Sequence, residues 1–236
     1  MKRSFMFICA AALLLTGCGA SADEASAQLF AMDTVMQLDA YGHQVKQAVS
    51  DAEETIQALE ARLSRTREDS LVSVLNQNGA AQDLSAAEQA LLSEALTFRD
   101  ATGGAFDITI APVMDAWGFT GDSYRVPAQD ELDALLENVN SDEIRLSGSS
   151  VTLGAGQAID LGGIAKGYTS DCVEAVFREN KIESGKISLG GNVFVLGGKP
   201  DGADWRVGIR DPQDENALAA VLTLRDAYAI TSGGYE

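Results

Sequence analysis

The stretch Asp160-Leu-Gly-Gly-Ile-Ala-Lys-Gly167 places an acid, a Gly-Gly pair and a lysine where a strand is expected to feed a helix. Gly162 and Gly163 can take backbone conformations closed to other residues and let main-chain groups approach a ligand closely. The following helix would offer free N–H groups to an anion, and Lys166 would add a point charge. The pattern suits a phosphate and a metal, although a Gly-Gly pair before a helix is also typical of a plain tight connection.

The segments around this stretch carry both helical and strand patterns. Helices are expected where apolar residues recur at three- and four-residue steps, and one of them begins at Ser85 with the spacing of a capping box; these segments are 45–63, 85–98, 129–138 and 166–179. Short runs with strand character cover 29–41, 144–146, 151–153, 186–196, 205–209 and 220–224. Helices that come early and strands that come late predict an α+β domain.

The N-terminus has the pattern of a bacterial lipoprotein signal. Lys2 and Arg3 precede an apolar run over 5–15, which is too short to span a bilayer and ends in Leu15-Thr-Gly-Cys18. We expect residues 1–17 to be a signal peptide, Cys18 to carry the lipid, 18–28 to be a flexible tether and 29–236 to be the folded domain. The protein would then be anchored in the cell membrane and face the periplasm or the cell exterior. The alternative is an ordinary cleaved signal with an incidental cysteine.

Charge and cysteine content narrow the class of protein further. The 236 residues carry a net charge of −18, and loss of the signal leaves 15 basic against 35 acidic side chains, which argues against nucleic acid as a partner. After processing, Cys172 would be the only free thiol, so no intramolecular disulfide is expected. Cys172 lies in a helical pattern, and we interpret it as a packing residue.

Seven motifs, in this order, resemble those of the bacterial FAD:protein FMN transferases, the ApbE-like flavin transferases. They are Met32-Asp-Thr34, SRTREDSLVSVLN from Ser64 to Asn76, GGAFDITIAPVMDAWGF from Gly103 to Phe119, DLGGIAKGYTSD from Asp160 to Asp171, Ser188-Leu-Gly-Gly-Asn192, Trp205 to Pro212, and Thr231 to Glu236. The resemblance implies one domain, with a largely antiparallel sheet and packed helices. It also implies cleavage of FAD, transfer of FMN to a threonine of an exported acceptor protein, and release of AMP.

The resemblance assigns roles to individual residues. FAD-contacting positions fall on Met32, Ala105, Phe106, Asp107, Asp160 and Lys166, and a metal-binding position falls on the main chain of Gly163, where Mg²⁺ is the expected cation. Read without the family, Met32 would more often be a core residue. An Asx turn is the alternative for Asp107, and a bulge or close backbone approach is the alternative for Gly190-Gly-Asn192.

Two departures from the family pattern bear on activity. Thr66 stands where the family often has an aromatic residue, so one stacking contact with a ring of FAD would be lost. The family also continues beyond Thr231-Ser-Gly with strands that bear a histidine and an Asp-Pro-x-Thr-Gly motif, whereas this sequence stops at Glu236. His43, the only histidine, is a poor substitute. We expect the 236-residue form to be inactive and a longer parent to be the transferase.

Three other functions stay open on the sequence alone. Hydrolysis of FAD to FMN and AMP, with water in place of threonine, is an alternative within the same family. A non-catalytic flavin-binding lipoprotein would keep the site and lack the reaction. In the third alternative, the glycine motifs are architectural and the lipoprotein acts only through protein contacts.

Overall fold

The computed structural model describes residues 23–119, 121 and 123–232, and these form an α+β fold built on an antiparallel sheet. The strands of the main sheet lie in the order β1-β2-β6-β7-β10, and every neighbouring pair is antiparallel. Their bounds are β1 Asp23–Ala31, β2 Thr34–Gly42, β6 Ser184–Leu189, β7 Asn192–Leu196 and β10 Ala227–Ile230. The α+β class with an antiparallel sheet is therefore confirmed.

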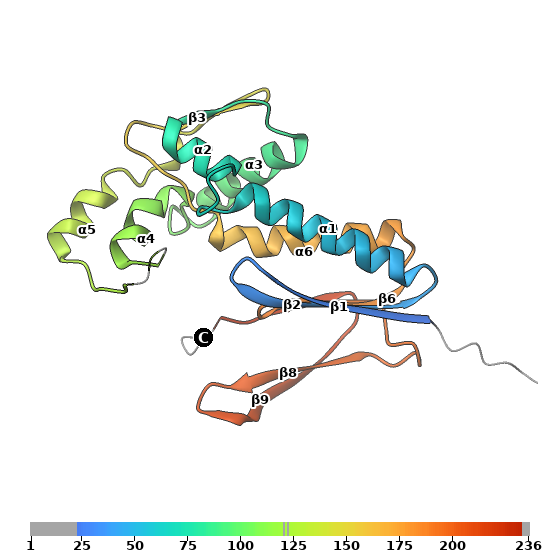
Figure 1. Ribbon diagram of the computed structural model, residues 1–236. Coiled ribbons are helices and arrows are strands. Elements are labelled where there is room, and N and C mark those ends of the chain that lie inside the picture. Colours follow the sequence, from blue (N-terminus) through green and yellow to red (C-terminus); the bar gives the residue numbers. More distant parts are fainter. Residues whose placement is uncertain (1–22, 120, 122, 233–236) are drawn as a thin grey trace, which may run out of the picture.

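Two long helices, α1 (Val45–Leu63) and α6 (Gly162–Glu179), cover one face of this sheet (Figure 1). Both were expected from their apolar spacing. The core between helices and sheet includes Met36, Ile56, Phe177 and Ile187, each fully buried. Burying such large apolar side chains is the main favourable term in folding, so this layer fixes how α6 lies across the strands.

The remaining helices gather beyond the N-terminal end of α6 around a second core (Figure 1). Leu75, Leu91, Ile108 and Ile159 lie at its centre. The α3 helix starts with the expected capping box, in which the Ser85 side chain accepts from the Glu88 N–H. The elements of this part are α2 Leu71–Asn78, β3 Ala80–Ala81, α3 Ala86–Ala101, η1 Ile108–Ile110, α4 Ala111–Trp117, α5 Gln129–Leu136, η2 Ser141–Glu143, β4 Arg145–Ser147 and β5 Ser150–Thr152.

A two-stranded ribbon lies against the other face of the main sheet. It consists of β8 (Trp205–Asp211) and β9 (Asp214–Leu224), and Figure 1 shows it below the sheet, opposite the helices. The Trp205 ring lies 6.1 Å from the Tyr41 ring, measured between centroids. Within the described residues, no helix combines the length and the hydropathy that crossing a bilayer requires.

The N-terminal boundary differs from the prediction, because the strand β1 begins at Asp23 and not at Leu29. Residues 23–28, expected to belong to the tether, pair in register with β2. Ala25, Ala27 and Leu29 pack against the main core, which is the period of two of a strand with one buried face. Small alanines made this alternation look like linker sequence.

Two predicted strands are each a hairpin. The segment 29–41 turns at Met32-Asp33 between β1 and β2, and the segment 186–196 turns at Gly190-Gly191 between β6 and β7. All four turn residues have positive φ, as two-residue hairpins require. The register places both turns at the same end of the sheet, because Met36 pairs with Leu189.

Gly162 and Gly163 also differ from the prediction. No strand precedes them, since residues 153–161 are irregular, and both glycines lie inside α6, outside the positive-φ region. Because these glycines have no side chain, neighbouring groups can approach them closely. A Cβ on Gly162 would lie 2.9 Å from Asp160 Oδ1, and one on Gly163 would lie 3.0 Å from a ring carbon of Phe106. Glycine is needed here for close approach.

Candidate functional site

Four motifs that are distant in sequence meet at the N-terminal end of α6. Asp160 precedes the helix, and its Oδ1 accepts from the Gly162 N–H at 2.6 Å. Its backbone N–H donates to the Ile108 carbonyl at 2.7 Å, which ties it to the Gly103–Phe119 motif. The Asn76 side chain donates to the Ile159 carbonyl at 2.9 Å and accepts from the Ile159 N–H at 2.7 Å. These two bonds connect the Ser64–Asn76 motif to the residue before Asp160. Hydrogen bonds from two other segments therefore hold the backbone of Ile159 and Asp160 at the start of α6.

Arg65 also belongs to this site, although its motif gave it no individual role. Its guanidinium donates to Asp160 Oδ2 at 2.9 Å and to Asp115 Oδ1 at 2.7 Å, and its side chain is only 13% exposed. Asp115 lies on α4, so the arginine joins the end of α1 to α4 and to the start of α6. Since two carboxylates neutralise it, Arg65 holds Asp160 in place more than it offers free charge to a ligand.

Lys166 has the opposite electrostatic setting. It is half-buried on the first turns of α6 and forms no ion pair with a carboxylate of the described residues. Gly163 and Lys166 are three residues apart and so share a face of the helix. Positive charge beside the N-terminus of a helix is the arrangement that attracts a phosphate.

Met32 lies next to the same helix, one turn beyond Lys166. The Thr169 hydroxyl donates to its sulfur at 3.6 Å, and its side chain packs against both hydrophobic cores. Phe106 approaches from the other side, against Gly163. Met32, Phe106, Asp160, Gly163 and Lys166 thus surround the first two turns of α6, as expected if they form one site. Ala105, also expected there, is exposed beside Phe106.

The carboxylate of Asp107 accepts hydrogen bonds from other residues of the protein. Its carboxylate caps η1 by accepting from the Thr109 N–H at 2.8 Å, and it also accepts from the Thr109 hydroxyl and from both the N–H and the hydroxyl of Ser141. This is the Asx-turn alternative for Asp107. The arrangement favours a role in shaping the backbone beside Phe106 over direct contact with ribose or adenine.

The pKa of the Asp107 carboxyl lies below its ordinary value of 3.8; burial by itself would raise it, but hydrogen bonds from Ser141 and Thr109 outweigh burial. A lowered folded-state pKa stabilises the fold at higher pH, and this stabilisation is lost as pH falls through that pKa. We expect Asp107→Asn to cost about 1–3 kcal/mol of unfolding free energy at pH 7. The cost should shrink below about pH 4. Urea unfolding between pH 3 and 7 measures it; a cost independent of pH would contradict the assignment.

The described residues do not form a metal centre by themselves. No group of three His, Cys, Asp or Glu side chains among them could hold a metal ion. Mg²⁺ takes six oxygen ligands, of which the carbonyl of Gly163 could supply one. The Mg²⁺ expected at Gly163 stays a prediction in which substrate oxygens complete the coordination.

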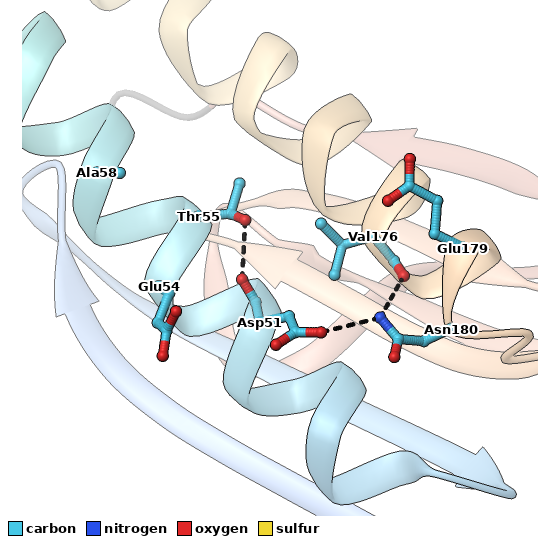
Figure 2. Close-up of a pocket in the computed structure, with 7 residues that line it drawn as sticks. All are labelled: Asp51, Glu54, Thr55, Ala58, Val176, Glu179 and Asn180. Atoms are coloured by element: carbon cyan, nitrogen blue, oxygen red, sulfur yellow. Dashed lines mark hydrogen bonds between the residues drawn. The ribbon is translucent and has the colours of Figure 1, made fainter.

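Two hollows lie away from this constellation or at its border. The groove in Figure 2 runs between α1 and α6 and has a volume of about 430 Å³. A 3.1 Å hydrogen bond between Asp51 and Asn180 crosses it. The groove is remote from the start of α6, because Val176, which lines it, lies about 15 Å along the helix from Lys166. A second hollow of about 380 Å³ lies between the β8–β9 ribbon and the sheet and reaches Gly191 and Thr231. Neither contains the residues expected to contact FAD.

Several remaining expectations have a place in the structure. Trp117 and Phe119 stack at 6.3 Å just after Asp115, so this aromatic pair borders the Arg65 side of the site. Thr66 is exposed, and both its hydroxyl and its backbone N–H lie 3.1 Å from the Ser64 hydroxyl oxygen. The Cys172 thiol is half-buried on α6, and burial raises its pKa, which fits a packing role. Cys18 lies outside the described residues.

A sequence profile of the ApbE family matches residues 32–236. The chain belongs to the ApbE family. The recognition of this family from its motifs is thereby confirmed, and the match begins at Met32, the turn residue that contacts α6.

Named relatives support this assignment. An FAD:protein FMN transferase of Treponema pallidum is 32% identical over 213 residues, which cover 82% of this chain and 59% of that protein. An FAD:protein FMN transferase of Vibrio cholerae is 26% identical over 245 residues, covering 99% of this chain and 73% of that protein. The crystal structure of the ApbE protein of Thermotoga maritima superposes with a TM-score of 0.83 at 26% identity, covering 91% of this chain and 72% of that one. The chain is thus shorter than all three ApbE relatives.

Proposed function

We propose that this chain carries the flavin site of an FAD:protein FMN transferase, an enzyme that moves FMN from FAD to a threonine of an exported acceptor protein and releases AMP. The observation that supports the proposal most directly is the meeting of Met32, Phe106, Asp160, Gly163 and Lys166 around the first turns of α6. The relatives that carry the transferase name add support.

In the proposed reaction the threonine hydroxyl oxygen attacks the phosphorus on the FMN side of the pyrophosphate. A new P–O bond forms to threonine, the bond to the AMP phosphate breaks, and AMP leaves with the bonding electrons. Lys166 and the N-terminus of α6 would stabilise negative charge on the phosphate oxygens, the main task of a protein in phosphoryl transfer. Bound Mg²⁺ would neutralise further pyrophosphate charge. The threonine hydroxyl proton would pass to water, because no described residue is assigned as its base.

The test is to incubate the purified protein with FAD, Mg²⁺ and an exported acceptor protein, and to measure intact mass, the modified residue and AMP together. FMN on threonine with an equal amount of AMP supports the proposal. AMP release that needs no acceptor and leaves it unlabelled would instead support FAD hydrolysis. FAD binding with no AMP under any condition would support a non-catalytic flavin-binding protein.

We further propose that Cys18 carries a lipid that anchors the protein in the membrane, facing the periplasm or the cell exterior. The support is the sequence Leu15-Thr-Gly-Cys18 after an apolar run. Cys18→Ala should move the protein from the membrane fraction to the soluble fraction and abolish incorporation of labelled palmitate. Unchanged partition and labelling would overturn the anchor.

A further inference from the structure

The turn between β1 and β2 is unusual in composition. It is a two-residue hairpin with Met32 at φ +49° and Asp33 at φ +57°. Both angles lie in the left-handed region, which turns of this type normally fill with Asn-Gly or a similar pair. A residue with a Cβ pays free energy to stay there. Contacts from outside the hairpin are therefore needed to hold this turn.

Those contacts come from the two long helices. The Met32 backbone N–H donates to Glu60 Oε1 on α1 at 2.9 Å, and the Met32 sulfur accepts from the Thr169 hydroxyl on α6 at 3.6 Å. The bond to Glu60 is charge-assisted and partly shielded from water, so it is the stronger of the two. Thr169 is fully buried. The backbone of Met32 is thus held by α1, and its side chain is held by α6.

The neighbouring hairpin adds a third support. Thr34, the first residue of β2, fills the space beside Gly190, where a Cβ would lie 2.2 Å from its hydroxyl oxygen. The turn cannot shift toward β6 without a clash. Strained backbone that the surrounding structure holds in place is concentrated at functional sites. A hairpin that only joined two strands would gain from Gly or Asn at these positions.

We propose that Glu60 is a positioning residue of the flavin site, which acts by holding the Met32 backbone so that its side chain meets bound FAD. The inference rests on the proposed function, because Met32 is taken as an FAD contact. In this proposal Glu60 acts only through its bond to the Met32 N–H and does not contact FAD. Its replacement should therefore weaken FAD binding only through displacement of Met32.

Three variants separate positioning from folding. Glu60→Ala removes the acceptor and should raise the Kd for FAD about tenfold. Glu60→Gln keeps an oxygen that can accept from Met32 and should stay within about twofold of the parent, although the charge is gone. Glu54→Ala, on the same helix and exposed, is the matched control and should leave Kd unchanged. All are measured by quenching of flavin fluorescence in the full chain, below the temperature at which any variant unfolds.

A second readout does not depend on FAD. In protein labelled with ¹³C-methyl methionine, the Met32 signal, assigned by its loss in Met32→Leu, should be sharp in the parent and in Glu60→Gln, and broadened or displaced in Glu60→Ala. In the parent it should also shift when FAD is added.

The outcomes distinguish the inference from the function on which it rests. If the unsubstituted protein does not bind FAD, both the positioning role of Glu60 and the proposed function are overturned. If FAD binds and the Met32 signal does not respond, the inference fails while the flavin function stands. A Glu60→Ala variant that matches the parent in both Kd and methyl signal, or a Glu60→Gln variant as weak as Glu60→Ala, would also refute the positioning role.

Discussion

Replacing Lys166 by methionine is expected to raise the Kd for FAD by roughly 10- to 100-fold while leaving thermal stability nearly unchanged. The reason is the distribution of charge at the start of α6. Arg65 is neutralised by Asp115 and Asp160, whereas Lys166 has no carboxylate partner among the described residues. Its charge is thus available to the pyrophosphate, and no ion pair of the fold is lost when it is removed. FMN transfer should fall at least as far, because phosphate charge changes during the reaction.

Lys46→Met is the matched control, since Lys46 is exposed on α1 and the substitution is identical. Flavin fluorescence titration and thermal unfolding, run on both variants, give affinity and stability separately. Lys166→Arg should recover only part of the affinity, because a guanidinium has a different shape and hydration. If Lys166→Met bound FAD as tightly as Lys46→Met, the lysine would not face the phosphates and the proposed orientation of FAD would be wrong.

Gly190→Val is expected to lower the unfolding free energy by about 3 kcal/mol or more. Gly190 has φ +56°, a conformation that a β-branched residue resists, and an added Cβ would lie 2.2 Å from the Thr34 hydroxyl oxygen and within 2.8 Å of its Cβ. The clash would push apart the β1–β2 and β6–β7 turns. Urea unfolding followed by circular dichroism measures the loss.

Gly148→Val separates strain from collision. Gly148 has the same φ of +56° in the β4–β5 turn, and an added Cβ there meets no atom within 4 Å. It should therefore cost only the backbone strain, about 1–2 kcal/mol. Thr34→Ala in the Gly190→Val background should recover part of the difference. Equal losses in the two valine variants would mean that the two turns can move apart freely.

Elements with local signals were predictable from the sequence. The Ser85–Glu88 capping box predicted α3, and an apolar stripe of period 3.6 predicted α1. Both patterns involve residues only three or four positions apart, so they can be recognised without knowledge of the fold. The first half of β1 was missed because its stability comes from pairing with β2 and from small alanines on the core, and neither raises local strand propensity.

The candidate site shows the same limit. Motif resemblance selected Met32, Asp160, Gly163 and Lys166, and the fold gathers them. It gave no indication of Arg65, whose partner Asp160 is 95 residues away, or of Glu60, whose partner is 28 residues away. Arg65 contacts the Asp160 carboxylate and Glu60 contacts the Met32 backbone N–H, and such roles become visible only when long-range contacts are known. Asp107 illustrates the converse, since a residue of the motif is used by the fold for capping.

The early start of β1 has a consequence for where the reaction can take place. With Cys18 anchored as proposed, the five residue steps to Asp23 can span at most about 18 Å. From Asp23, the strand runs as a rigid strut of nine residues, about 30 Å long, to the turn at Met32. Under these two proposals, the anchor and the flavin site would lie toward opposite ends of one strand. The flavin site of the tethered protein would then lie at most roughly 50 Å from the bilayer surface, and a threonine farther from the bilayer would be out of its reach.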